Sequence, residues 1–266
     1  MVTYLSVDLS NRCAKACPFC YNGSAPGGEG RWPVAEVESF LQDCAAHGLQ
    51  AVSFGGGEPL EYEGIFHLLG VLRGRLFRSL TSNGLPLADP ACLAALLKAA
   101  PDKVHLSLHF PDHANERARI RVQVGLLLRH GIRAGVNILV ARSALAAARV
   151  AVLELRAAGL SPAEILLLPR RGGDSAETPT VTEMGYVAGG PAPGERAPPG
   201  APPPRFQAPS CLLQCGKSPR FCSVGWDRTV GWCSYTSSRV RLAAPTHAAL
   251  ATALDGLPLA YCGAPS

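Results

Sequence analysis

Short apolar runs of strand length alternate with longer segments of helical periodicity through the first two thirds of the chain. The strand-like runs lie at Tyr4–Leu9, Ala51–Phe54, Arg78–Thr81, Val104–His109, Gly135–Val140 and Ile165–Leu168. This alternation predicts a parallel sheet whose strands are joined by right-handed crossovers. Six such units are too few for an eight-stranded barrel. We therefore expect an α/β fold, a partial (β/α)6 TIM-like barrel with a short cysteine-rich C-terminal extension.

The segments between the runs carry start and stop signals of helices. The first helix is predicted to begin with Pro33 at its first helical position and to stop at Gly48. Another begins at the Asp89–Pro90 pair, and two more end at Gly131 and Gly159. In a parallel α/β fold the loops at the carboxyl ends of the strands converge, so we expect the chemistry there.

The composition of the chain changes after Met184. Eight prolines and five glycines make up half of the 26 residues from Gly185 to Ser210, and such a stretch cannot bury a core. The segment from Cys211 onward is short, and its core is too small to be stable without a stabilising cross-link such as a bound metal. We expect a barrel domain over residues 1–184, a linker or mobile loop over 185–210 and a cysteine-rich segment over 211–266.

The charge and hydropathy of the chain argue against several classes of function. With 17% charged residues and a formal net charge of +5, the chain gives no indication of a nucleic acid as partner. No run reaches the roughly 18 apolar residues of a membrane span, and no export signal is apparent. Ten cysteines in a cytoplasmic chain then indicate metal binding or catalysis rather than disulfides. A cluster of arginines fits either an anionic substrate or a solvated helical face: Arg117, Arg119, Arg121 and Arg129.

Three cysteines, Cys13, Cys17 and Cys20, directly follow the first predicted strand. Three thiolates within eight residues can surround one iron–sulfur cubane, because the intervening residues let the loop curl around it. A cluster held in this way keeps one iron free of protein ligands, and such an open position can bind a substrate or cofactor. Zinc is a poorer match because a structural site usually takes four protein ligands, and disulfide pairing would leave an odd thiol.

The spacing Cys-x3-Cys-x-aromatic-Cys, with Phe19 at the aromatic position, resembles the signature of the radical S-adenosylmethionine (SAM) superfamily. The resemblance implies a [4Fe–4S] cluster whose open iron site binds the amino and carboxylate groups of SAM. It further implies reductive cleavage of SAM to methionine and a 5'-deoxyadenosyl radical that abstracts a substrate hydrogen. Phe19 would lie near the adenine, with ordinary packing as its alternative role.

A glycine-rich motif, Gly55-Gly56-Gly57-Glu58-Pro59, follows the second predicted strand. Glycines in a strand-to-helix loop let the backbone approach a ligand closely. The motif resembles the superfamily's Gly-Gly-Glu motif, which implies that Glu58 and the backbone of Gly56 and Gly57 contact the amino group of SAM. Other polar residues resemble SAM-contacting or site-lining positions of the superfamily, and the first three of them also suit turns or helix caps: Ser82, Asn83, Ser107 and Asn137.

Two histidines, His109 and His113, lie at and after the end of the fourth predicted strand. An imidazole can transfer a proton near neutral pH, so both are candidate catalytic residues. A structural role at a strand end is the alternative.

Four cysteines follow the Pro/Gly-rich stretch within 23 residues, at Cys211, Cys215, Cys222 and Cys233. Four thiols fit either a cluster without an open position or a structural zinc. The run from Cys222 to Cys233 predicts a hairpin, and it resembles the Asp-Gly-x-Val-x-x-Cys turn of SPASM and twitch extensions. That resemblance implies an auxiliary [4Fe–4S] cluster, although Arg228 stands where the pattern has glycine.

The remaining cysteines have other expected roles. Cys262 is an alternative fourth ligand or a free thiol, whereas Cys44 and Cys92 are expected to be small core residues on helices.

Together these features predict a radical SAM enzyme of the oxidoreductase type that oxidises or cross-links a peptide or a small natural-product intermediate. An electron donor such as flavodoxin or ferredoxin would be its partner. Two other functions stay open: an activase that installs a glycyl radical in a partner enzyme, and a non-catalytic module that binds SAM and the cluster.

Overall fold

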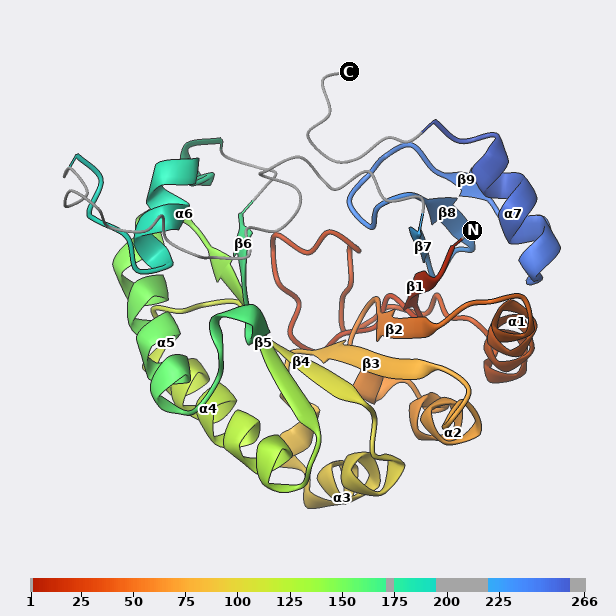
Figure 1. Cartoon of the computed structure of the whole chain (residues 1–266), viewed down its shortest axis with the longest axis horizontal. Helices are drawn as coiled ribbons and strands as arrows, with labels where there is room; N and C mark the ends of the chain where they lie inside the picture. Colours follow the sequence, from red (N-terminus) through yellow and green to blue (C-terminus); the bar gives the residue numbers. More distant parts are fainter. Residues whose placement is uncertain (1, 171–174, 195–219, 259–266) are drawn as a thin grey trace. The chain divides into compact units, whose positions relative to one another are not determined.

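The structure is a computed structural model, and it describes residues 2–170, 175–194 and 220–258 (Figure 1). Two compact units divide the chain. The first comprises Met1–Val104 together with Cys215–Ser266, and the second comprises His105–Gln214. The boundary falls within strand β4. Each unit is described by itself below.

The first unit is built on strands from both ends of the chain. Its central strand β1 pairs in parallel with β2 on one side and with β7 on the other, and β3 continues the parallel pairing from β2. Strands β8 and β9 extend β7 in antiparallel fashion. Figure 1 shows β7 beside β1. The strands are β1 (Tyr4–Asp8), β2 (Ala51–Gly55), β3 (Phe77–Ser82), β7 (Phe221–Val224), β8 (Thr229–Gly231) and β9 (Val240–Arg241).

The helices of the first unit are α1 (Val34–Ala46), α2 (Ile65–Val71), α3 (Pro90–Ala99) and α7 (His247–Asp255), with short 3-10 turns at Pro59–Glu61 and Pro86–Ala88. Asp89 begins α3 by accepting hydrogen bonds from the backbone N–H groups of Ala91 and Cys92. At the other end, the buried Arg78 side chain donates to the carbonyls of Ala99 and Ala100. This charge is tolerated in the core because it also pairs with Asp102.

The register of the strands places two kinds of side chain on opposite faces of the sheet. Leu5 of β1 is the partner of Cys222 of β7, and both are almost completely buried. The adjacent positions, which point to the opposite face of the sheet, carry serines across four strands. These register partners are Ser6, Ser53, Ser79 and Ser223. One face is therefore an apolar core, and the other is lined by small hydroxyl side chains.

The second unit alternates strands and helices in the same way. β5 pairs in parallel with β6, with Val136 opposite Ile165. Its elements, with the boundary strand β4 placed first, are β4 (Lys103–Leu108), α4 (Ala114–Arg129), β5 (Arg133–Val140), α5 (Leu145–Ala157), β6 (Ile165–Pro169) and α6 (Val181–Val187). Short 3-10 turns lie at Arg142–Ala144, Pro162–Glu164 and Ser175–Glu177.

The predicted elements agree closely with these bounds, and the differences have local causes. Every predicted strand is present within two residues of its expected ends. Pro33 precedes α1 as its N-cap instead of occupying the first helical position. Helix α6 reaches Val187, so helical structure continues past Met184, because Thr180 and Glu183 form a capping box that starts it. Most of the predicted linker lies outside the described residues.

Candidate active site

The loop that follows β1 carries the three N-terminal cysteines and is closed at its base by backbone hydrogen bonds. Asn11 pairs with Gly30, and Cys13 N–H donates to the carbonyl of Ala25 at 3.0 Å. The Asn11 side chain also accepts a bond from Gly30 N–H. Between these ties the chain makes two tight turns, in which Cys20 N–H donates to Cys17 O and Gly23 N–H to Cys20 O. We call residues 11–30 the cluster loop.

The thiols of the cluster loop are accessible donors. Cys13, Cys17 and Cys20 are all partly exposed. Asn83 Nδ2 donates to Cys13 Sγ at 3.5 Å. Burial raises the pKa of the Cys13 thiol, while hydrogen bonds from the backbone of Lys15 and Ala16 act in the opposite direction.

These residues fit an iron–sulfur cluster by the chemistry of their donors. Three thiols lie in one loop, and no carboxylate or imidazole competes with them between Cys13 and Cys20. Within the described parts of the chain, no three His, Cys, Asp or Glu side chains converge on a common metal position. A cubane needs no such common position, because each of its thiolate ligands binds a different iron.

The glycine motif packs directly against the cluster loop. Gly57 N–H donates to Ser10 O at 2.7 Å, and Glu58 N–H donates to Arg12 O at 2.8 Å. A Cβ at position 57 would lie 1.8 Å from the Arg12 carbonyl oxygen, and Gly56 has a φ of +103°. Only glycine permits this approach. The predicted Gly56, Gly57 and Glu58 thus lie next to the backbone that leads into Cys13.

Glu58 is a buried carboxylate held by backbone donors. It is 1% exposed, and its Oε1 accepts from Leu60 N–H while its Oε2 accepts from Asn83 N–H at 2.7 Å. Burial raises its pKa to about 7, although these hydrogen bonds and one from Ser82 partly oppose the rise. The ionised form of Glu58, which accepts hydrogen bonds from a ligand amine, therefore predominates only above about pH 7.

Asn83 joins Glu58 to the cluster loop, and Ser82 hydrogen-bonds Glu58. Both also stabilise the turn after β3, since Ser82 Oγ accepts from Gly84 N–H and Asn83 Oδ1 accepts from Leu85 N–H. Asn83 additionally contacts Glu58 through its backbone and Cys13 through its side chain. The turn role and the proximity to the predicted site therefore both hold for Asn83. Phe19 lies partly exposed in the cluster loop, and its place near an adenine stays a prediction.

The other candidates belong to the second unit. Ser107 is buried near the end of β4, and Asn137 Oδ1 on β5 lies 3.1 Å from His105 Nδ1. His109 donates its backbone N–H to Glu116. His113 precedes α4 as its N-cap and stacks on Phe110 at 5.1 Å. These contacts give His113 a structural role within its unit, and the catalytic roles of His109 and His113 stay predictions.

Cys222 and Cys233 flank the predicted hairpin, which the structure confirms as the antiparallel pair β7–β8. Cys233 is partly exposed, but Cys222 is completely buried and interacts electrostatically with the Cys44 thiol of α1. The side chain of Ser223, on the other face of β7, hydrogen-bonds Ser234 next to Cys233. The two cysteines thus differ in their surroundings: Cys222 is in the core, and Cys233 is partly exposed after the end of β8.

This placement disagrees with the predicted ligand role of Cys222. The Cys222 thiol is completely buried in the core, and burial raises its pKa well above the usual range. Cys44 is a buried core residue as expected, and Cys92 is partly exposed on α3. Cys211, Cys215 and Cys262 lie outside the described residues.

Four residues that sequence reasoning missed connect the cluster loop with the hairpin. Asp8 ends β1 with 4% exposure and accepts a hydrogen bond from Tyr21 Oη at 3.2 Å. Burial raises its pKa to about 6. Tyr21 packs on Tyr235 with ring centroids 4.9 Å apart, and Arg239 donates to Cys233 O. The sequence offered one indication of this role for Asp8, namely its position at a strand end just before the cysteines.

Arg228 shows how the chain tolerates a departure from the glycine of the extension pattern. It adopts a left-handed conformation with a φ of +63°, which is unfavourable for a residue with a side chain. Its guanidinium pairs with Glu36 of α1 and lies over the Trp32 ring, 5.6 Å from the centroid. These contacts offset the backbone strain and tie the hairpin to α1.

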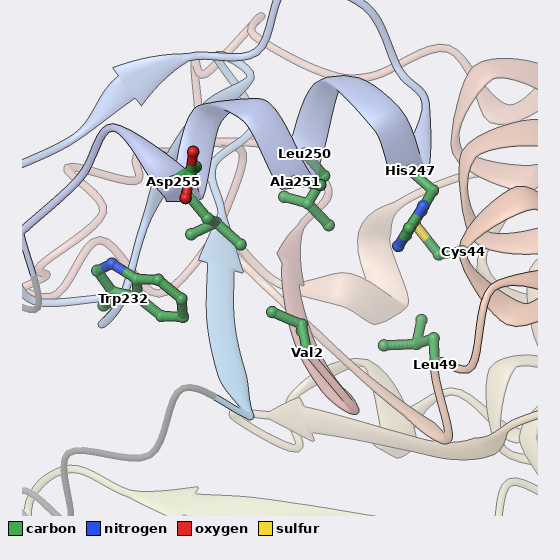
Figure 2. A pocket seen from close by; sticks show the side chains of 9 residues that line it. Val2, Cys44, Leu49, Trp232, His247, Leu250, Ala251 and Asp255 are labelled. Carbon is green, nitrogen blue, oxygen red and sulfur yellow. The ribbon is translucent and has the colours of Figure 1, made fainter.

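A separate cavity of about 300 Å³ lies elsewhere in the first unit. Figure 2 shows Val2, Cys44 and residues of α7 around it. Val2 precedes β1, whereas the cluster loop follows the carboxyl end of that strand. The cavity is therefore not the site of the predicted SAM chemistry.

The sequence of residues 7–134 matches the model of the radical SAM superfamily. A probable GTP 3',8-cyclase of Methanocella arvoryzae is 32% identical over 111 residues, which cover 42% of this chain and 36% of that protein. The PqqA peptide cyclase of Gluconobacter oxydans is 32% identical over 114 residues, 41% of this chain and 30% of that one. The matched stretch thus spans about a third of each curated relative.

Solved structures share the fold over most of the chain. Streptococcus suis SuiB bound to S-adenosylmethionine superposes with a TM-score of 0.66 at 13% identity, covering 91% of this chain and 63% of SuiB. The protein anSMEcpe with bound AdoMet and Cp18Cys peptide gives 0.63 at 15% identity, with 93% and 80% covered. These similarities confirm the predicted fold class.

No helix among the described residues is both long and apolar enough to cross a membrane. The cysteine spacing, the glycine motif and the match over residues 7–134 agree with one another. Residues 7–134 therefore match a radical SAM superfamily domain, and that superfamily uses a [4Fe–4S] cluster and S-adenosylmethionine.

Proposed function

We propose that this protein cleaves SAM reductively and abstracts a hydrogen atom from a peptide or peptide-like natural-product intermediate, with net oxidation or cross-linking as the outcome. The observation that carries the proposal is the chain of contacts from Glu58 through Asn83 to Cys13. It joins the residue expected to contact SAM with a residue expected to hold the cluster, and both belong to the first unit.

Each residue of the proposed site has a separate role. Cys13, Cys17 and Cys20 would hold a [4Fe–4S] cluster. When bound, the cluster supplies the electron that splits the sulfonium of SAM and so generates the 5'-deoxyadenosyl radical. Glu58 would accept hydrogen bonds from the SAM amino group, and Asn83 keeps both Glu58 and Cys13 in place. The tight packing of Gly57 against Arg12 fixes the distance between the two loops.

A peptide substrate is favoured by two kinds of relative. SuiB has been solved bound to its precursor peptide SuiA, with a TM-score of 0.64 to this chain. A peptide cyclase is among the proteins similar in sequence. The GTP 3',8-cyclases among the relatives favour a second candidate, cyclisation of a purine nucleotide. A net oxidation places the enzyme among oxidoreductases, with a flavodoxin- or ferredoxin-type electron donor.

An auxiliary cluster is part of the proposal. Cys233 is accessible at the end of the hairpin and is the described residue that suits it. The other ligands would come from Cys211, Cys215 and Cys262, because the core position of Cys222 argues against its use. Zinc is the alternative metal for the same thiols.

Anaerobic reconstitution with iron and sulfide tests the proposal. We expect about eight irons per chain for two [4Fe–4S] clusters, and formation of 5'-deoxyadenosine after addition of SAM and dithionite. About four irons would remove the auxiliary cluster, and failure to bind iron would contradict the whole proposal. Bound SAM without any 5'-deoxyadenosine under strong reductant would instead support a non-catalytic module.

The substrate class is tested with the reconstituted protein. Candidate precursor peptides encoded beside the gene are compared with GTP as stimulants of 5'-deoxyadenosine formation. A mass loss of two hydrogens in a peptide supports the peptide proposal. Turnover of GTP supports the nucleotide alternative, and a glycyl radical signal in a partner protein would identify an activase.

A further inference from the structure

A groove along α7 lies at the opposite end of β1 from the cluster loop. It encloses about 300 Å³, which is at the lower end of the range for small-molecule sites. Figure 2 shows α7 along one side and Val2, Leu49 and Cys44 facing it. The strand between this groove and the cluster loop spans roughly 17 Å, at about 3.3 Å for each of its residues.

One face of α7 forms the long wall of the groove. Five of its residues line the cavity, and their positions follow the spacing of a single helical face: His247, Leu250, Ala251, Leu254 and Asp255. At 1.5 Å per residue this face extends for roughly 12 Å. Leu250 and Leu254 are nearly buried, as is Trp232 on the opposite side. The middle of the groove is therefore apolar, with polar residues at its two ends.

The end of the groove at Asp255 is electronegative. Asp255 is the last residue of α7, where the helix dipole already carries a partial negative charge, so a carboxylate there is unfavourable without a cation. Asp255 is exposed and forms no hydrogen bond or ion pair with the part of the chain that the structure describes. Among the described residues that line the groove there is no lysine or arginine.

The other end is formed by the first residue of α7, His247, and by Cys44 of α1. Its imidazole stacks face to face on His47, with centroids 4.5 Å apart, and its backbone N–H donates to Asp43. The Cys44 thiol lies beside it (Figure 2). This end can therefore receive a neutral apolar or weakly polar group.

We propose that this groove binds a small primary amine with an apolar body, its ammonium group at Asp255 and its apolar part between Trp232, Leu250 and Leu254. The site differs from the proposed SAM site and does not depend on the proposed function. Trp232 immediately precedes Cys233, so an occupant contacts the segment that carries this cysteine.

The experiment uses the purified full chain and three probes of similar shape. Phenethylamine carries the cation, phenethyl alcohol is its neutral analogue and 3-phenylpropionate is its anionic analogue. Binding is measured by isothermal titration calorimetry and by the shift of the unfolding temperature, which rises with a ligand that binds only the folded state. We expect phenethylamine to bind about five-fold more tightly than the alcohol and the anion to bind most weakly.

Matched variants locate the site. Ala251→Leu fills the groove and should abolish binding, whereas Ala248→Leu makes the same change at an exposed position of α7 outside the groove and should not. Asp255→Asn should remove the preference for the amine over the alcohol, and Glu63→Gln should preserve it because Glu63 is exposed and not part of the groove. If Ala251→Leu fails to fold, the Asp255→Asn comparison still tests the charge.

Three results would overturn the proposal. Equal affinity for the amine and the alcohol would show that Asp255 does not select a cation. Unchanged binding of phenethylamine to Ala251→Leu would show that the amine binds elsewhere. Absence of binding by all three probes at millimolar concentration would contradict the site as a whole.

Discussion

The cluster loop and the C-terminal hairpin both carry cysteines in the first unit, but they hold them in different ways. All three thiols of the cluster loop are partly exposed, in a loop whose base is closed by backbone hydrogen bonds. In the hairpin, Cys233 is partly exposed beyond the end of β8, while Cys222 is a core residue of β7. A cysteine on a loop is free to bind metal, whereas a cysteine on a strand binds only if it points to the right face.

The two regions also depend on the rest of the unit differently. The cluster loop is braced by the glycine motif through the carbonyls of Ser10 and Arg12. The hairpin is braced by side chains, with Arg228 on α1 and Arg239 on the Cys233 carbonyl. Hydrogen bonds between backbone groups are kept in most substitutions. A contact made by a side chain is lost when that one residue is replaced. The following experiments test this contrast.

The largest effect is expected from Cys13→Ala. Removal of one of three thiols leaves the cluster without a sufficient ligand set, so iron content should fall and 5'-deoxyadenosine formation should drop by at least about 100-fold. Iron analysis and chromatography of the product provide the measurement. Cys92→Ala is the matched control, because Cys92 is also a partly exposed thiol but lies on α3. Retained iron in Cys13→Ala would show that the cluster loop is not the metal site.

A smaller effect, about ten-fold in SAM affinity, is expected from Glu58→Gln. The ionised carboxylate is the better acceptor for a ligand amine, and burial raises the pKa of Glu58 to about 7. SAM should therefore bind well above pH 7 and progressively less well as the pH falls through that value. Calorimetric titrations at several pH values measure this. In Glu58→Gln the affinity should be weak and should lose the part of its pH dependence centred near 7; an unchanged profile would assign that dependence to another group.

Cys222→Ala and Cys233→Ala separate the two hairpin cysteines. Cys222→Ala should lower the free energy of unfolding by about 1–2 kcal/mol, because it removes a buried sulfur from the core, and should leave the iron content unchanged. Cys233→Ala should remove about four irons with little effect on apo-protein stability. Urea denaturation and iron analysis give the two readouts. Loss of iron in Cys222→Ala would restore that residue as a ligand and would remove the contrast drawn above.

The smallest effect concerns Arg228. Arg228→Ala keeps the left-handed strain and loses the contacts with Glu36 and Trp32, whereas Arg228→Gly loses the contacts but relieves the strain. The alanine variant should therefore be less stable than the glycine variant by about 1 kcal/mol. Thermal and urea unfolding of both variants measure the difference. A glycine variant that is the less stable of the two would mean that position 228 carries no backbone strain.

The sequence was sufficient to predict the features of the fold that depend on neighbouring residues in the chain. Strand lengths, the Asp89–Pro90 start of α3 and the stops at Gly131 and Gly159 follow from short-range rules, and all are present. The loop that carries Cys13 and the glycine motif beside it were identified by spacing. Their contact through Gly57 and Arg12 is consistent with the expectation that loops after parallel strands converge.

Other features depend on partners far away in the sequence. The parallel pairing of β7 with β1 was not predicted, because the short run Phe221–Val224 carries no signal for its partner. The face on which Cys222 lies follows from that pairing, so its core position could not be foreseen. Asp8 was overlooked for the same reason, since its partner Tyr21 is brought near only by the fold of the loop.

The pairing of β7 with β1 has a consequence for how the protein is made. The chain up to Val140 can complete most of its local elements during synthesis, but β1 acquires its neighbour β7 only after residue 224 has been translated. Until then the strand that leads into the cluster loop is an unprotected sheet edge, prone to pairing with other chains. Cluster insertion into a properly supported loop is thus a late event, and chaperones that cover this edge should raise the yield of iron-loaded protein, whereas slow translation before residue 220 should lower it.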